Sequence, residues 1–225
     1  MGPGDHHCHE GQARIATIKV RDRHDTVIVQ EKLDGSCVAV AKVQGEVIPL
    51  TRAGYRAVAS HYFQHVLFDV WVREHYARFD TLLNEGERIV GEWLAQAHGT
   101  RYDLSSWNGE PFVAFDLIDN GGRRTLYREF QQRCRDILAF AHEISAGPPM
   151  AIDVAMERLG SGAGGEGREN HYGHHGALDP VEGAIWRVER EGRVDFITKY
   201  VRPDKVDGSY LESITGREAV WNWRP

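Results

Sequence analysis

The sequence of 225 residues predicts an α+β fold, in which strands form antiparallel sheets and helices flank them. Short β-branched segments, separated by turn residues, dominate the first quarter of the chain and return near its end. Two stretches in the middle instead repeat apolar residues at helical spacing. The pairs Gln44-Gly45 and Glu191-Gly192 read as tight turns between neighbouring strands, so these strands should pair antiparallel.

The expected strands are short segments rich in β-branched or aromatic residues, which fit a pleated and half-buried surface. They are 15–20, 26–31, 36–43, 46–51, 88–95, 111–118, 151–154, 181–189 and 193–201. Hairpins join 36–43 to 46–51 and 181–189 to 193–201, because only a tight turn separates the strands of each pair.

Two segments, 61–79 and 127–142, are expected as amphipathic helices because their apolar residues recur three or four positions apart. The buried stripe of the first should consist of Phe63, Val66, Leu67, Val70 and Trp71. The corresponding face of the second holds Phe130, Cys134, Ile137, Leu138 and Ala141. Both helices should therefore pack one side against a sheet.

The remaining segments are expected as loops and a docked end. The segment 98–110 is polar, and the segment 160–176 is rich in glycine and poor in apolar residues. A glycine-rich stretch of that length predicts a mobile loop, and such loops are often lids over a binding site. After Pro203, Trp221 and Trp223 are expected to anchor the end of the chain on the core.

Composition sets limits on the class of protein. The net charge of −6 argues against a chain that coats nucleic acid by bulk charge, although a local basic groove is compatible with it. The three cysteines are odd in number and widely spaced, which favours a reducing, cytoplasmic compartment. We expect residues 1–12 to be a flexible segment and residues 13–225 to form one domain without a membrane span.

The stretch from Glu31 to Ser36, between two expected strands, is the strongest candidate for a reactive site. It places Lys32 two residues before Asp34, and Gly35 follows directly. A lysine amine is a nucleophile only when neutral, and its usual pKa of about 10.4 keeps it charged at neutral pH. Nearby cations, a metal ion or burial would have to disfavour the ammonium form.

Further polar or aromatic residues stand inside or beside the expected strands in a fixed order. They are Arg52, then Glu92 in Gly91-Glu92-Trp93-Leu94, Phe115 before Asp116-Leu117 in the expected strand 111–118, Glu182 before Gly183, and Lys199 in the last strand. Together with Lys32 this series resembles motifs I, Ia, III, IIIa, IV and V of the covalent nucleotidyltransferases. That superfamily comprises ATP-dependent DNA ligases, RNA ligases and mRNA capping enzymes, and the resemblance spans about 26–202.

Within the superfamily the sequence is most similar to RNA ligases of the RNA ligase 2 type. DNA ligases and capping enzymes carry an OB-fold domain after motif V, but only 23 residues follow Arg202. Those two families also usually place arginine five residues after the nucleophile, where RNA ligase 2 types have asparagine and this sequence has Cys37. The resemblance implies a nucleotidyltransferase domain of antiparallel sheets and flanking helices around an ATP cleft.

The resemblance implies catalytic roles for three residues. Lys32 would attack the α-phosphate of ATP, forming a lysyl-adenylate and releasing pyrophosphate. Lys199 would be a phosphate-binding cation that offsets the charge building on that phosphate. Glu182 would orient Mg²⁺, directly or through water. Asp34 and Gly35 would shape the turn that presents the lysine.

The resemblance also implies how the nucleotide is held. Arg52 and Glu92 would hold the ribose, the glutamate as a hydroxyl acceptor. Phe115 would stack on the adenine, and Glu31 would accept a hydrogen bond from the adenine amino group. These residues and Lys32, Glu182 and Lys199 make up the expected ATP site.

The expected function is an ATP-dependent RNA ligase that seals 5′-phosphate and 3′-hydroxyl ends, acting as a monomer on RNA, nicked duplex or an RNA/DNA hybrid. Two alternatives stay open: a stand-alone nucleotidyltransferase acting on another acceptor, and an ATP sensor without turnover. The sensor is suggested by Cys37 and by motif V, where the family has two lysines and this sequence has Ile197 and Lys199. Retention of Lys32, Glu92 and Glu182 favours catalysis, because binding alone needs no nucleophile.

Overall fold

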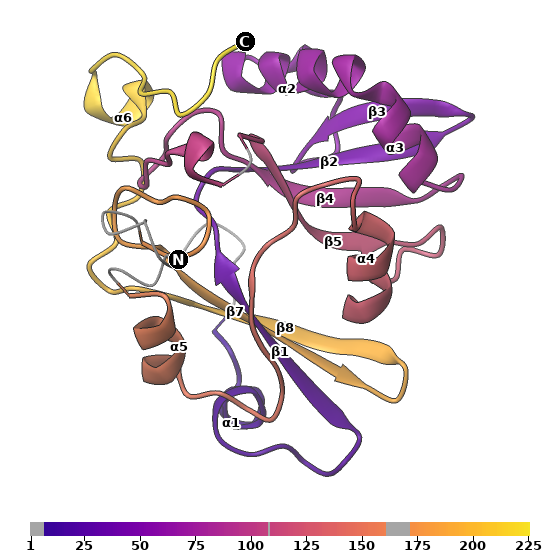
Figure 1. The fold of residues 1–225 in the computed structure, drawn as a ribbon, viewed down its shortest axis with the longest axis vertical. Coiled ribbons are helices and arrows are strands. Elements are labelled where there is room, and N and C mark those ends of the chain that lie inside the picture. Colours follow the sequence, from indigo (N-terminus) through magenta and orange to yellow (C-terminus); the bar gives the residue numbers. More distant parts are fainter. Residues whose placement is uncertain (1–6, 108, 161–171) are drawn as a thin grey trace.

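A computed structural model describes residues 7–107, 109–160 and 172–225 (Figure 1). It is an α+β fold with two four-stranded sheets and helices around them, as the sequence predicts. The strands are β1 (Asp25–Lys32), β2 (Ser36–Val43), β3 (Glu46–Thr51), β4 (Arg88–Trp93), β5 (Phe112–Ile118), β6 (Glu143–Gly147), β7 (Gly183–Arg190) and β8 (Arg193–Val201). The α-helices are α1 (Glu10–Thr17), α2 (Phe63–Glu74), α3 (Tyr76–Leu82), α4 (Tyr127–Cys134), α5 (Ile152–Arg158) and α6 (Glu212–Thr215).

All pairings within the two sheets are antiparallel. Sheet A has the strand order β6-β1-β7-β8, and sheet B has the order β3-β2-β4-β5. Sheet B occupies the upper half of Figure 1 and sheet A the lower half. The chain passes from sheet A to sheet B in the short turn between β1 and β2, so this turn lies where the two sheets meet.

Aromatic side chains form the centre of the core between sheet B and helices α2 and α3. Phe68 of α2 packs against Trp93 of β4 with ring centroids 5.2 Å apart and against Phe112 of β5 at 5.7 Å. Gly91 of β4 has no room for a side chain, since a Cβ there would lie 2.5 Å from the ring of Phe112. A second cluster, which includes Val27 of β1 and Trp186 of β7, stabilises sheet A.

The hairpin predictions are confirmed. The strands β2, β3 and β8 begin and end at the predicted residues. Gln44 and Gly45 both have positive φ, as do Glu191 and Gly192. Two consecutive residues with positive φ match the right-handed twist of the flanking strands, which explains why these short turns close the hairpins.

The strand predicted at 15–20 is wrong, because the chain forms helix α1 there. Its sequence holds helix-favouring residues between the β-branched ones, and only Ala16 of the helix is buried. Ile18 follows the helix and is 73% exposed, so this apolar residue does not belong to a buried strand. The helix begins at Glu10, inside the segment 1–12 that we expected to be flexible.

The single helix predicted at 61–79 is two helices, α2 and α3, which separate at His75. The His75 ring stacks on Trp71 with centroids 4.4 Å apart, and its Nδ1 lies 2.8 Å from the Trp71 carbonyl oxygen. Leu67 and Trp71 of the predicted stripe are buried, but Phe63 is 61% and Val70 41% exposed. Their places in the core are taken by the side chains of Phe68 and Val72.

The helix predicted at 127–142 is also shorter than expected, since α4 ends at Cys134. Asp136 has a φ of 61°, and the chain then runs beside β5, where the Ala114 amide donates to the Ala139 carbonyl at 2.8 Å. The sequence did not predict β6, which follows. The strand predicted at 151–154 is wrong, because α5 forms there and buries Ala155.

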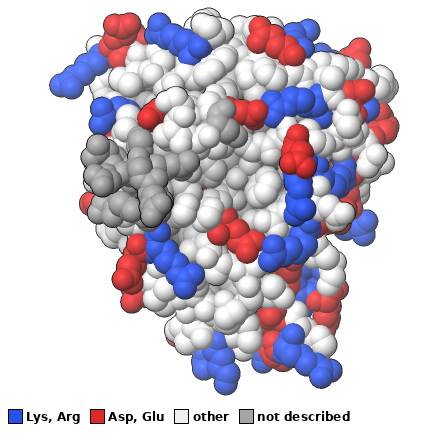
Figure 2. Space-filling view, viewed as in Figure 1, with Lys and Arg blue, Asp and Glu red and all other residues white. Residues whose placement is uncertain are grey.

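The glycine-rich loop predicted at 160–176 lies largely outside the described residues. The expected docking of the end of the chain is confirmed, because Trp221 and Trp223 pack against the core. Among the described residues all three cysteines are free, and no helix has the length and apolarity to cross a bilayer. Acidic and basic side chains are interspersed over the face seen in Figure 2.

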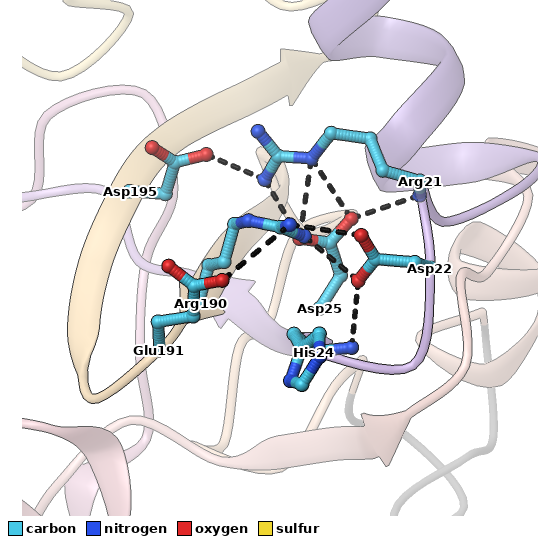
Figure 3. A network of polar contacts seen from close by, with 7 residues as sticks. All are labelled: Arg21, Asp22, His24, Asp25, Arg190, Glu191 and Asp195. Atoms are coloured by element: carbon cyan, nitrogen blue, oxygen red, sulfur yellow. Dashed lines mark hydrogen bonds and ion pairs between the residues drawn. The ribbon is translucent and has the colours of Figure 1, made fainter.

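A network of ion pairs joins the loop before β1 to the β7–β8 hairpin (Figure 3). Asp25 lies at its centre, with its side chain fully buried. Its Oδ1 accepts from Arg21 at 2.7 Å and from Arg190 at 3.0 Å. Arg190 also binds Asp22, and Arg21 also binds Asp195, so the network spans 174 positions of sequence.

Candidate functional site

Lys32 is the last residue of β1 and lies where the chain leaves sheet A for sheet B. It is paired in register with Gly183 of β7. A Cβ at Gly183 would lie 1.9 Å from the Tyr200 carbonyl oxygen, so only glycine fits beside the lysine. The Lys32 side chain is 19% exposed, and its Nζ forms an ion pair with Oε2 of Glu182.

Carboxylates surround the Lys32 amine. Burial lowers the pKa of Lys32, but the charges of Glu182 and Glu92 outweigh this effect and raise the pKa above its usual value. For the acid Glu92 burial has the opposite effect and raises the pKa to about 7, although the charge of Lys32 opposes this shift. Without a ligand, Lys32 is therefore an ammonium, which is opposite to what a nucleophile needs.

A cavity of about 200 Å³ opens beside Lys32, between the two sheets. Phe115 of β5 lines it from sheet B, and Ile185 and Ile197 line it from sheet A. Glu31 and Glu92 also border it. The fold thus brings together five of the residues singled out in the sequence. Glu31, Lys32, Glu92 and Phe115 line the cavity, and Glu182 is joined to it by the ion pair with Lys32.

Glu31 is a buried carboxyl at this cavity, with only 2% of the residue exposed. Its Oε2 accepts a hydrogen bond from the His174 amide at 2.8 Å, whereas its Oε1 has no hydrogen-bond partner among the described residues. Burial raises the pKa of Glu31 to about 8. A buried polar atom without a partner is costly, and this oxygen is packed against Gly173.

Arg52 and Lys199 are not among the residues that line the cavity. Lys199 pairs in register with Ile185, and it follows Ile197 by two residues on the same strand, so it lies on the cavity side of β8. Arg52 is exposed just after β3, near enough to Cys37 for its charge to oppose the raised pKa of that thiol, which burial brings to about 12.

Arg202 does not replace the missing lysine of motif V. Its Nε donates to the Val181 carbonyl at 2.6 Å, and its guanidinium also binds Asp204. The side chain therefore braces the segment before β7 and is not among the residues that line the cavity.

A buried ion pair in the lining of the cavity was not found from the sequence. Arg187 of β7 donates to Asp116 of β5 at 3.0 Å, and both residues are at most 2% exposed. Arg124 binds the second oxygen of Asp116 at 2.8 Å. Asp116, Arg124 and Arg187 all line the cavity, so this pair joins the two sheets at the cavity itself.

The turn after Lys32 is held by polar contacts on Asp34. The Asp34 amide donates to the Tyr102 hydroxyl at 3.0 Å, and its Oδ2 accepts from the Gly99 amide at 2.9 Å. Lys205 forms an ion pair with the same oxygen. Gly35 completes the turn, since a Cβ there would lie 2.5 Å from the Trp93 carbonyl oxygen.

The structure thus combines two antiparallel sheets with a cavity between them and a lysine at the edge of that cavity. A family model described as RNA ligase matches residues 25–201, so the chain belongs to the RNA ligase family. A search of the curated proteins found no match.

Solved structures share the fold. A mutant of Naegleria gruberi RNA ligase with AMP and Mn is 13% identical over 80% of this chain and 50% of its own, with a TM-score of 0.53. A second mutant of that ligase, without ligand, is 15% identical and has a TM-score of 0.52. The match covers 87% of this chain and 53% of the ligase. An archaeal ATP-dependent RNA ligase is 20% identical and has a TM-score of 0.47. The match covers 79% of this chain and 42% of the archaeal ligase. The chain thus spans about half the length of the solved structures it matches.

Proposed function

We propose that this protein is an ATP-dependent RNA ligase that adenylylates itself on Lys32 and then seals 5′-phosphate and 3′-hydroxyl ends. The observation that carries the proposal is the position of the Lys32 amine, at the edge of a cavity between two sheets and in contact with Glu182. Membership of the RNA ligase family supports the choice of substrate.

The cavity suits a nucleobase. A flat ring can lie between Phe115 on one wall and Ile185 on the other, with apolar contacts to both. Glu31, which lines the cavity, would accept a hydrogen bond from the amino group of adenine. Glu92 and Arg52 would then hold the ribose, and Lys199 would bind the phosphates.

The donor set fits Mg²⁺ held mainly by water and by ATP. The described residues contain no cluster of three or more metal-ligating side chains, so they offer no protein cage for an ion. Magnesium often binds through one carboxylate, several waters and substrate phosphates, and Glu182 can provide that carboxylate. A bound Mg²⁺ would supply positive charge beside the α-phosphate.

The chemistry of the first step places a clear demand on Lys32. The neutral amine forms a bond from nitrogen to the α-phosphorus of ATP while the bond to pyrophosphate breaks. Glu182 and Glu92 stabilise the ammonium form in the free protein. Any ligand that engages the Glu182 carboxylate would weaken this stabilisation, so ATP binding and loss of the proton from Nζ should be coupled.

The proposal also covers the polynucleotide partner, the cellular process, the compartment and the oligomeric state. RNA, either as a nicked duplex or as an RNA/DNA hybrid, would be the polynucleotide partner, and RNA repair would be the process. The free cysteines are compatible with the cytoplasm. We also propose that residues 13–225 act as one nucleotidyltransferase domain and that the protein works as a monomer.

The test is to incubate the protein with α-labelled ATP and Mg²⁺ and to look for label on the denatured chain. Lys32→Ala and Lys32→Arg should both abolish the label, because a guanidinium stays protonated and cannot attack. Lys42→Ala is the control, since Lys42 lies on β2 and pairs with Asp80 at 2.7 Å, outside the cavity lining. Label that survives at Lys32→Ala would refute the assignment.

A second assay separates the ligase from a sensor. The wild type is given a pre-adenylated RNA end and a 3′-hydroxyl end, and joining is followed on a gel. Tight ATP binding without label and without joining would mean that the chain is a sensor. Label without joining of any RNA would indicate transfer to another acceptor.

A further inference from the structure

The residues that follow β8, which we call the tail (residues 202–225), connect sheet A to sheet B (Figure 1). The Tyr210 amide donates to the His98 carbonyl at 2.8 Å, and the Ala97 amide donates to the Val220 carbonyl at 2.9 Å. The Asn222 side chain donates to the Leu94 carbonyl at 2.7 Å. These bonds fasten the tail along the segment that follows β4.

Lys205 is the one lysine of the tail, and its side chain is only 3% exposed. Its Nζ forms an ion pair with Oδ2 of Asp34, whose side chain is 11% exposed. A Cβ at Gly99 would lie 2.5 Å from this Nζ, so the backbone of the segment after β4 closes over the ammonium. A buried ammonium is costly unless it is paired, which makes this contact a fixed part of the structure.

Asp34 transmits this contact to Lys32. It lies two residues after the lysine, within the turn in which the chain crosses from sheet A to sheet B. The Gly99 amide and Lys205 both donate to Oδ2, and the Asp34 amide is held by the Tyr102 hydroxyl. Lys205 itself is not among the residues that line the cavity, so it has no described contact with the space for ATP.

We propose that Lys205 is a positioning residue, which holds the turn after Lys32 so that the amine points at the α-phosphate of bound ATP. The inference rests on the proposed function of Lys32 and deepens it. It predicts a separation of two effects: the rate of the chemical step depends on Lys205, whereas the affinity for ATP does not. A displacement of about 1 Å at a reacting atom can cost about 10² in rate.

The first test compares single-turnover adenylylation at a series of ATP concentrations. Lys205→Met keeps the length of the side chain and removes the charge. The maximal rate should fall about 10²-fold, while the apparent KM for ATP changes less than about threefold. Lys42→Met is the matched control, because Lys42 also pairs with an aspartate, Asp80, at the far end of β2, and its rate should not change.

A double substitution distinguishes positioning from general damage to the fold. Lys205→Met leaves the Asp34 carboxylate buried without its cation, so part of its effect is an unpaired charge. In Asp34→Asn/Lys205→Met both charges are absent, and the amide oxygen at position 34 can still accept from Gly99. The double variant should therefore recover at least tenfold in rate over Lys205→Met, and its Tm should return toward that of the wild type.

Hydrogen exchange gives a readout that needs no turnover. The backbone amides of residues 33–36 should exchange faster in Lys205→Met than in the wild type, with little change in β5 or α4. Unchanged exchange together with an unchanged adenylylation rate would overturn the inference, and so would an equal loss of rate and ATP affinity. If the wild type forms no adenylate, the proposed function fails, and the exchange of 33–36 still decides whether Lys205 holds the turn.

Discussion

At the scale of single residues, the buried carboxyl of Glu31 opposes stability at neutral pH. Burial raises its pKa from 4.5 to about 8, so between these values the unfolded chain is ionised and the folded chain keeps its proton. The unfolded state then binds fewer protons, and the free energy of unfolding falls as pH rises from about 4.5 to about 8.

Glu31→Gln should therefore stabilise the protein at pH 8 and have little effect at pH 4. The amide oxygen can still accept from His174, and no buried charge can form. The expected gain at pH 8 is on the order of a few kcal/mol, which thermal unfolding at both pH values would detect. An equal change in Tm at the two pH values would contradict the raised pKa.

Replacing Lys199 should affect the rate of adenylylation much more than the affinity for ATP. It is exposed on β8 next to the cavity wall, in register with Ile185. Lys199→Ala should slow adenylylation by about 10²–10³, since charge builds on the α-phosphate only in the transition state. ATP affinity, measured by calorimetry, should weaken much less, and a loss of equal size in both quantities would argue against this role.

The residues of the candidate site that the sequence indicated are those whose proposed role depends on residue type at a fixed place in a strand. Lys32, Glu92 and Glu182 could be recognised because each stands near a glycine at the end or in the interior of an apolar segment. Lys205 and Arg187 gave no such signal, because their partners lie 171 and 71 positions away. Only the three-dimensional structure shows that Asp34 and Asp116 neutralise them.

At the scale of elements, the sequence predicted strands well where a tight turn fixed the register. Segments whose ends were set by tertiary contacts were predicted less well. At the break between α2 and α3 the His75 ring stacks on Trp71, a contact that helical periodicity does not encode. In α1 and α5, β-branched residues indicated strands, but helix-favouring residues stand beside them, and each helix buries only one residue, an alanine.

Gly183 shows how strictly one element is constrained at the site. Gly183→Ala would place a methyl group 1.9 Å from the Tyr200 carbonyl oxygen, so β7 and β8 would have to separate beside Glu182. We expect a loss of more than about 2 kcal/mol in the free energy of unfolding, measured with urea.

Gly11→Ala is the control for that substitution. Gly11 lies in α1 with no atom within 4 Å of a Cβ, so alanine there should be neutral or should stabilise the helix by up to about 1 kcal/mol. Similar stability of Gly183→Ala and Gly11→Ala would show that the two strands can shift at no cost.

At the scale of the whole molecule, two groups of carboxyls act in opposite directions on stability. In the network of Figure 3, hydrogen bonds from Arg21 hold the pKa of Asp25 at about 2, against burial. This stabilisation is present above the usual pKa near 4 and is lost as pH falls toward 2. Glu31 and Glu92 act the other way. Because burial raises their pKa values, the free energy of unfolding falls as pH rises above about 4.5.

By themselves, these two groups predict a Tm that declines as pH falls from about 4 toward 2 and as pH rises from about 4.5 toward 8. Asp25→Asn should flatten the acidic side of the profile and leave the alkaline side unchanged. Calorimetric scans from pH 2 to pH 9 without nucleotide would measure both limbs. A maximum at pH 8 would show that the buried carboxyls of the cavity are ionised in the folded state.

The topology of the two sheets also has a consequence for how the chain folds. Sheet B consists of consecutive strands between residues 36 and 118, whereas in sheet A β1 must pair with β7, about 150 positions later. Closing a long loop costs more entropy than closing a short one, and contacts between distant residues slow folding. We expect sheet B to form first as a nucleus, so that Lys32 and Glu182 meet only in the last and slowest phase of folding.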